Sequence, residues 1–72
     1  MKISSQQTKK LFLNENQKFK SLGFSMLLIR LKALNEKNPA QFTLEDCTIA
    51  INKFLEKFQA VMAADFEIIA KL

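Results

Sequence analysis

The sequence predicts an all-α fold, an antiparallel helical hairpin with a short additional N-terminal segment. Two observations predict it: one proline separates two long stretches of helical apolar spacing, and neither glycine nor proline interrupts the second stretch. A chain of 72 residues forms one domain. A domain of this size buries only about 60% of the surface that its unfolded chain exposes, so we expect oligomerisation to complete a helical bundle. The expected parts are an N-terminal segment over 1–21, a helix over about 22–37, a turn over 38–43 and a helix over about 44–71.

The turn is the clearest local feature, in the stretch NEKNPAQFTLED. Pro39 disfavours a helical conformation at Asn38, so the first long helix is expected to end by residue 37. Thr43 is a good N-cap, because its hydroxyl can accept a hydrogen bond from an amide of the following turn. The two acids after Leu44 suit the helix dipole, and Phe42 can pack back on the first turns as a hydrophobic staple. Such a short connection predicts antiparallel neighbours.

The second long helix is predicted to run from about 44 to 71, because neither glycine nor proline follows Thr43. Its apolar residues recur at alternating intervals of four and three, which predicts a heptad seam. Asp65 lies within this seam. We expect its carboxylate to accept hydrogen bonds at the start of the first long helix or to pair with Lys18; the alternative is a solvated position at a frayed end. The seam residues are Cys47, Ile51, Phe54, Phe58, Val61, Asp65, Ile68 and Leu72.

The first long helix has two apolar faces, which predicts burial on both sides. These faces are Leu22, Met26, Ile29 and Ala33 on one side, and Phe24, Leu27, Leu31 and Leu34, with Leu28 beside them, on the other. Folding the chain about residues 39 and 40 docks the first face on the seam, with Leu22 opposite Phe58 and Ala33 opposite Cys47. The second face is then left uncovered by the seam and needs either another chain or the N-terminal segment; with another chain it is the expected protein interface. The predicted interface residues are Phe24, Leu27, Leu28, Leu31, Leu34 and Phe66.

Residues 1–21 allow two interpretations. A short helix, a turn at residues 14–16 and the main helix is the favoured one, because Gln, Lys and Leu dominate the stretch and Asn14 with Gln17 resembles a capping box. The alternative is a small β-hairpin, with KKLFL and QKFK on either side of NEN.

Charge is divided unevenly along the chain. Residues 1–38 hold eight basic and two acidic side chains, a net +6, whereas residues 39–72 hold three basic and five acidic ones, a net −2. A solvated surface accounts for this division, but a basic half can also bind an acidic partner or a phosphate backbone. The predicted contact residues for such a partner are Lys9, Lys10, Phe12, Lys18, Phe19 and Lys20.

The inventory of reactive groups argues against an enzyme. The chain has no histidine, so the usual general base is missing, and its one glycine cannot form a phosphate-binding loop. Cys47, the single cysteine, is expected to be buried and unreactive, which fits a reducing, cytoplasmic compartment. We therefore expect no cofactor, no metal and no small-molecule substrate. No apolar run approaches the roughly 20 residues of a membrane span, so no membrane partner is expected.

The sequence thus predicts a small protein-binding module, an adaptor, inhibitor or regulator that acts through apolar helix faces and self-associates. The identity of its protein partner does not follow from the residues. The first alternative is a nucleic-acid-binding regulatory protein that uses the basic N-terminal half. A further alternative is a structural subunit of a helical assembly, with which the turn NPAQ and the apolar end IIAKL are compatible.

Overall fold

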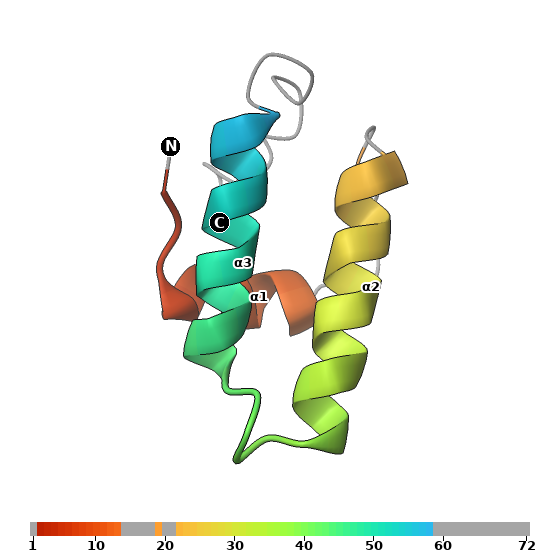
Figure 1. Cartoon of the computed structure of the whole chain (residues 1–72), viewed down its shortest axis with the longest axis vertical. Coiled ribbons are helices and arrows are strands. Elements are labelled where there is room, and N and C mark those ends of the chain that lie inside the picture. The colour runs from red at the N-terminus through yellow and green to blue at the C-terminus, as the bar shows by residue number, and fades with distance from the viewer. Residues whose placement is uncertain (1, 14–18, 20–21, 59–72) are drawn as a thin grey trace.

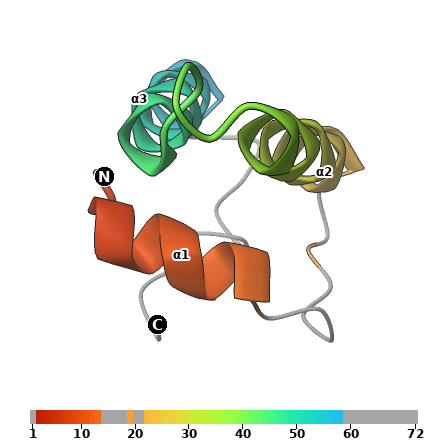
Figure 2. The ribbon, with the colours of Figure 1, turned by 90° about the horizontal axis from the view of Figure 1, so that it is seen from below.

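The computed structural model of the chain describes residues 2–13, 19 and 22–58. These residues form three helices and no strand, so the predicted all-α class is confirmed. Figure 1 shows α2 and α3 running antiparallel, joined by a tight turn at one end. Figure 2 shows α1 lying across one side of this hairpin, under both helices. The helices are α1 (Ser5–Leu13), α2 (Leu22–Lys37) and α3 (Leu44–Lys57).

The turn between α2 and α3 forms as its residues predict. Thr43 is the N-cap of α3, and its hydroxyl accepts a hydrogen bond from the amide of Asp46 at 3.2 Å. The Asp46 carboxylate accepts one from the amide of Thr43 at 2.9 Å, which completes a capping box. Phe42 packs against the core, as a staple should. The end of α2 and the start of α3 are therefore determined by residues that lie close to them in the sequence.

The N-terminal segment forms a helix where the sequence allowed either a helix or a strand. Residues 9–13, the expected first strand of the alternative hairpin, are helical. Ser4 and Gln7 form a second capping box, with the Ser4 amide donating to Gln7 Oε1 at 2.9 Å and the Gln7 amide donating to Ser4 Oγ at 3.3 Å. This cap starts α1 at Ser5, since it satisfies amides that the first helical turn leaves free.

The core lies between all three helices, and α2 contributes the face that was expected to be covered by another chain or by the N-terminal segment. Phe24 is fully buried, and Leu28 and Leu31 are almost so. Leu22 is 77% exposed and Ile29 64% exposed, although both were expected to dock on α3. The predicted docking face of α2 is therefore wrong, because the face of Phe24, Leu28 and Leu31 is turned inward instead. The buried hydrophobic residues are Ile3, Leu11, Phe24, Leu28, Leu31, Cys47, Ile51 and Leu55.

The third helix keeps its predicted inner face but is shorter than predicted. Cys47 and Ile51 are fully buried, in agreement with the predicted seam. The helix ends at Lys57, and Phe58 is its C-cap, with its amide donating to the carbonyl of Phe54 at 3.0 Å. A continuous helix through Phe58 is therefore not formed. The calls on Asp65 and on the rest of 59–72 lie outside the described residues.

Polar side chains join the N-terminal arm, residues 2–13, to α3. The hydroxyl oxygens of Thr8 and Thr48 lie 2.6 Å apart in a buried hydrogen bond. The side-chain amide of Asn52 forms two hydrogen bonds with the backbone of Ile3. Its Oδ1 accepts from the Ile3 amide at 2.7 Å, and its Nδ2 donates to the Ile3 carbonyl at 3.0 Å. The arm is therefore fixed both by buried apolar side chains and by directional hydrogen bonds.

Candidate interaction surfaces

An apolar stripe runs along the outside of α2. We define the outer stripe as Leu22, Met26, Ile29 and Ala33, which follow one another at helical spacing of four, three and four residues. All four are exposed, with Leu22 at 77%, Met26 at 49% and Ile29 at 64%. Isolated exposed apolar residues are ordinary, but a stripe aligned on one helix face is typical of a helix that binds another helix.

A shallow groove of about 250 Å³ adjoins the outer stripe between α2 and α3. The phenyl ring of Phe54 forms part of its wall and stacks at 4.7 Å from the ring of Phe58, which is 38% exposed. Gly23 removes a side chain at the groove's edge and lets another backbone approach. The groove residues are Gly23, Met26, Leu27, Arg30 and Phe54.

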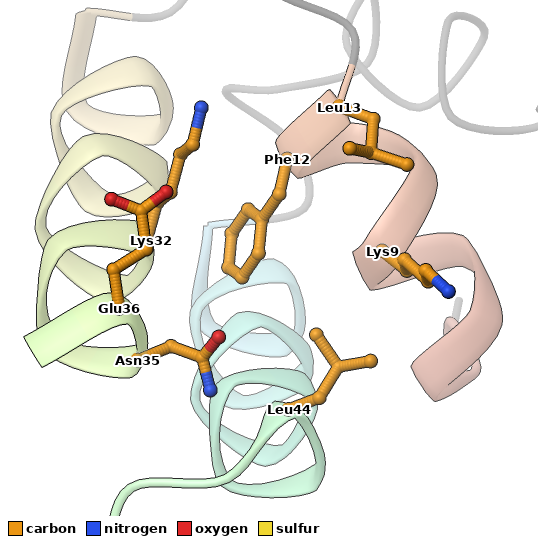
Figure 3. Close-up of a pocket in the computed structure, with 7 residues that line it drawn as sticks. All are labelled: Lys9, Phe12, Leu13, Lys32, Asn35, Glu36 and Leu44. Carbon is orange, nitrogen blue, oxygen red and sulfur yellow. The ribbon is translucent and has the colours of Figure 1, made fainter. Parts of the chain in front are cut away.

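A second cleft, of about 320 Å³, lies where all three helices meet (Figure 3). Phe12 and Leu44 point into it, and Asn35 reaches toward it from α2. The Asn35 side-chain amide donates to the Phe42 carbonyl at 2.8 Å, so this group holds the turn. The cleft has an apolar floor with charged side chains at its edges. It is lined by Lys9, Phe12, Leu13, Lys32, Asn35, Glu36 and Leu44.

The predicted protein interface is placed mostly inside the fold. Phe24, Leu28 and Leu31 are buried by contacts within the chain, so they offer no surface to a partner. Leu27 is half-buried in the groove beside Phe54. Leu34 is 46% exposed and remains accessible. The sixth predicted residue, Phe66, is outside the described residues. The opposite face of the same helix does expose apolar side chains, those of Leu22, Met26 and Ile29.

The predicted contacts for nucleic acid are only partly brought together. Lys9 and Lys10 are exposed on α1, which carries no acidic residue. Phe12 packs into the cleft, and the ring of Phe19 packs edge-on against Phe24 with ring centres 4.8 Å apart. Neither ring is therefore presented for stacking on bases. Lys18 and Lys20 fall in a part of the chain that is not described.

The single cysteine has the environment that was predicted for it. The side chain of Cys47 is fully buried, and its Sγ lies 3.7 Å from the carbonyl oxygen of Leu31. Burial raises the pKa of the thiol above 9.0, and the carboxylate of Asp46 raises this pKa further. The thiolate is disfavoured, so Cys47 is not set up as a nucleophile.

The described residues offer neither a metal centre nor a membrane span. No group of three or more metal-ligating side chains gathers among them. None of their helices combines the length and the apolar character needed to cross a bilayer.

Sequence reasoning missed the polar residues that hold the arm. Asn52, Thr8 and Thr48 were given no role. One signal was present: Thr8 sits one turn before Leu11, and Thr48 one turn before Asn52, so each pair shares a helix face. The sequence does not indicate that these two faces meet.

Comparison with known proteins gives no further guide to function. The chain matches no protein-family model, no curated protein and no solved structure.

Proposed function

We propose that this chain is a non-enzymatic protein-binding module, an adaptor, inhibitor or regulator, and that the outer stripe of α2 binds a second copy of the chain. The observation that carries this proposal is the exposure of Leu22, Met26 and Ile29 on one face of one helix. Pairing two such stripes removes apolar surface from water, at roughly 25 cal/mol for each Å² buried. A domain of this size has a small core of its own, so burying further apolar surface between two copies contributes substantially to its stability.

The spacing of the stripe favours a second copy in antiparallel orientation. Placing the two-fold axis between Met26 and Ile29 sets Met26 against Ile29 of the second copy, and Leu22 against Ala33. Leu22, the most exposed side chain of the stripe, then meets Ala33, its smallest side chain. Arg30 borders the stripe on the same side as Gly23, seven residues earlier, and these two would lie side by side across the axis. Gly23 has no side chain to obstruct the guanidinium.

Sedimentation equilibrium at micromolar concentration tests this proposal. The wild-type chain is expected to form a dimer, and Ile29→Lys is expected to be monomeric with unchanged helix content, because it places a charge at the centre of the stripe. Ile49→Lys is the matched control, since Ile49 is 50% exposed on α3 away from the stripe, and this variant should dimerise like the wild type. A monomeric wild-type chain at about 100 μM, or an Ile29→Lys variant that dimerises as well as wild type, would refute the proposal.

Nucleic-acid binding is a second candidate, supported by the two exposed lysines of α1 and its lack of acids. Binding through phosphates would weaken linearly as the logarithm of salt concentration rises. Replacing Lys9 and Lys10 with Gln should then reduce both the affinity and this slope. If no RNA or DNA is bound at about 50 mM salt, protein binding is left as the function.

A further inference from the structure

The N-terminal arm occupies a binding site on the α2–α3 hairpin in the manner of a bound peptide. It begins with three extended residues beside α3 and continues as α1 across the hairpin (Figures 1 and 2). Three of its side chains, Ile3, Thr8 and Leu11, are at least 95% buried. The remaining positions of the arm are exposed or half-buried, including Leu13 at 72%. A few buried anchors in an otherwise exposed segment are typical of peptide recognition by a groove.

The hairpin supplies the polar groups that define where the arm binds. Asn52 pairs with both the amide and the carbonyl of Ile3, as a neighbouring β-strand would. One turn earlier on α3, Thr48 meets the hydroxyl of Thr8 and also lies 3.4 Å from the hydroxyl of Ser5. These contacts fix the register of the arm, because a shift of one residue would separate Thr8 from Thr48 and remove the buried hydrogen bond between their hydroxyls.

We propose that this site, formed by α3 with α2, accepts the arm of a second copy as well as the chain's own arm, so that two copies can exchange their arms. Every contact described above is made between side chains or backbone groups of 2–13 and of the hairpin. None of these contacts depends on the arm belonging to the same chain. Eight residues, 14–21, connect the arm to α2. Exchange of an identical element is a low-cost route to a dimer, because it forms the same contacts again.

The covalent connection sets how often exchange occurs. A short connection gives a tethered segment an effective concentration in the millimolar range. At micromolar protein the chain's own arm therefore wins, and exchange is a minor event in the intact chain. It becomes measurable when the arm of the receiving chain is weakened, because the site is then vacated while the groups that recognise the arm remain.

The test uses the full chain carrying two substitutions. Leu11→Asn weakens the chain's own arm, and Ile29→Lys removes association through the outer stripe, so that failure of the proposed function does not affect the result. The probe is a fluorescent peptide of residues 2–13, followed by anisotropy. We expect it to bind this chain at least about tenfold more tightly than the chain with an intact arm, because the tethered arm competes in the latter.

Matched controls test the contacts. A peptide with Leu13→Asn should bind like the original, since Leu13 is exposed, whereas a peptide with Leu11→Asn should lose binding. Adding Asn52→Ala to the receiving chain should weaken binding at least several-fold, because the two hydrogen bonds to the Ile3 backbone are lost. No binding by a receiving chain that keeps its helix content would overturn the proposal, as would equal affinity for the chains with weakened and intact arms.

A second measurement covers a receiving chain that loses its helices. A protease site is inserted within residues 14–18, and the chain is cut after folding. The freed arm should then exchange with excess labelled peptide while the hairpin remains folded. Failure to take up the peptide, or unfolding of the hairpin when the cut arm leaves, would overturn the proposal, because no site would then persist for a second copy's arm.

Discussion

The hydroxyl oxygens of Thr8 in α1 and Thr48 in α3 lie 2.6 Å apart in the buried contact between these helices. Thr8 Oγ1 is also 3.2 Å from the Ser4 carbonyl oxygen, and Thr48 Oγ1 is 3.0 Å from the Leu44 carbonyl oxygen. Two hydroxyls have two protons for these three contacts. One proton must lie between the threonines, so only one hydroxyl at a time can donate to its carbonyl. The two side chains therefore act as a unit.

Replacing one threonine should lower the free energy of unfolding by more than half of the loss caused by replacing both. Thr8→Val or Thr48→Val leaves the other buried hydroxyl with its carbonyl contact but without the hydrogen bond between the threonines, so we expect a loss of about 1 kcal/mol in the free energy of unfolding. The double variant should cost less than the sum of the two, because the second substitution removes a hydroxyl whose bond to the first is already lost. Urea unfolding of the four proteins measures this double-mutant cycle. Additive losses would show that the two hydroxyls do not depend on each other.

The two faces of α2 should respond differently to truncation. Phe24 is fully buried, so Phe24→Ala should destabilise the chain by about 3–5 kcal/mol. Met26 lies on the outer stripe, and Met26→Ala should change stability by no more than about 0.5 kcal/mol at concentrations where the chain is monomeric. Thermal unfolding of both variants makes the comparison. The opposite ranking would mean that α2 docks through its other face.

The two hydrogen bonds between Asn52 and the Ile3 backbone should protect the Ile3 amide from exchange with solvent. Asn52→Ala removes both hydrogen bonds to the Ile3 backbone, so the Ile3 amide should exchange with solvent faster. Global stability should fall by about 1–2 kcal/mol. Lys53→Ala changes an exposed neighbour on the same helix and should alter neither quantity. Hydrogen exchange followed by NMR distinguishes these outcomes, and unchanged Ile3 exchange in Asn52→Ala would contradict the prediction.

Alkaline pH should destabilise the fold through Cys47. Burial, followed by the Asp46 carboxylate, raises the pKa of this thiol when the chain is folded. The folded state therefore holds the proton more tightly than the unfolded one. This contribution to stability is fully present below the unfolded pKa and is lost as pH rises toward the folded pKa.

Cys47→Ala removes this titration and serves as the reference. The stability difference between wild type and Cys47→Ala should be constant below about pH 8 and should shrink above it, to the disadvantage of the wild type. Urea unfolding over this pH range measures the difference, in which the titration of lysines common to both proteins cancels. A difference that stays constant up to about pH 10 would argue against a raised pKa.

Local signals predicted the end of α2 and the start of α3 better than they predicted contacts. The stop before Pro39 and the cap at Thr43 depend on neighbouring backbone groups, so their effect can be derived from a few residues. The end of α3 at Lys57 is different, because no glycine or proline marks it. The residues on both sides of Lys57 favour a helical conformation, so the local sequence did not indicate that the helix ends there.

The docking of α2 shows where sequence reasoning stops. Both faces of this helix are apolar, and the face of Leu22 and Ile29 matches the seam of α3 in size as well as the face of Phe24 does. The pattern of two helices could not decide between them. The arm adds a third body, with Leu11 buried in the same core as Phe24. When the Phe24 face of α2 packs against both α1 and α3, more apolar surface is removed from water than when it packs against α3 alone.

The sequence by itself determined that this protein is helical, where its central turn lies, how α3 is capped and that Cys47 faces inward, because each of these depends on backbone conformation or on one helix's own periodicity. Only the tertiary structure decided which face of α2 is exposed and that Thr8, Thr48 and Asn52 hold the arm. The contacts that hold the arm join groups 40 or more residues apart in the chain. The free energy of such contacts exists only once the helices are packed, so no local pattern carries it.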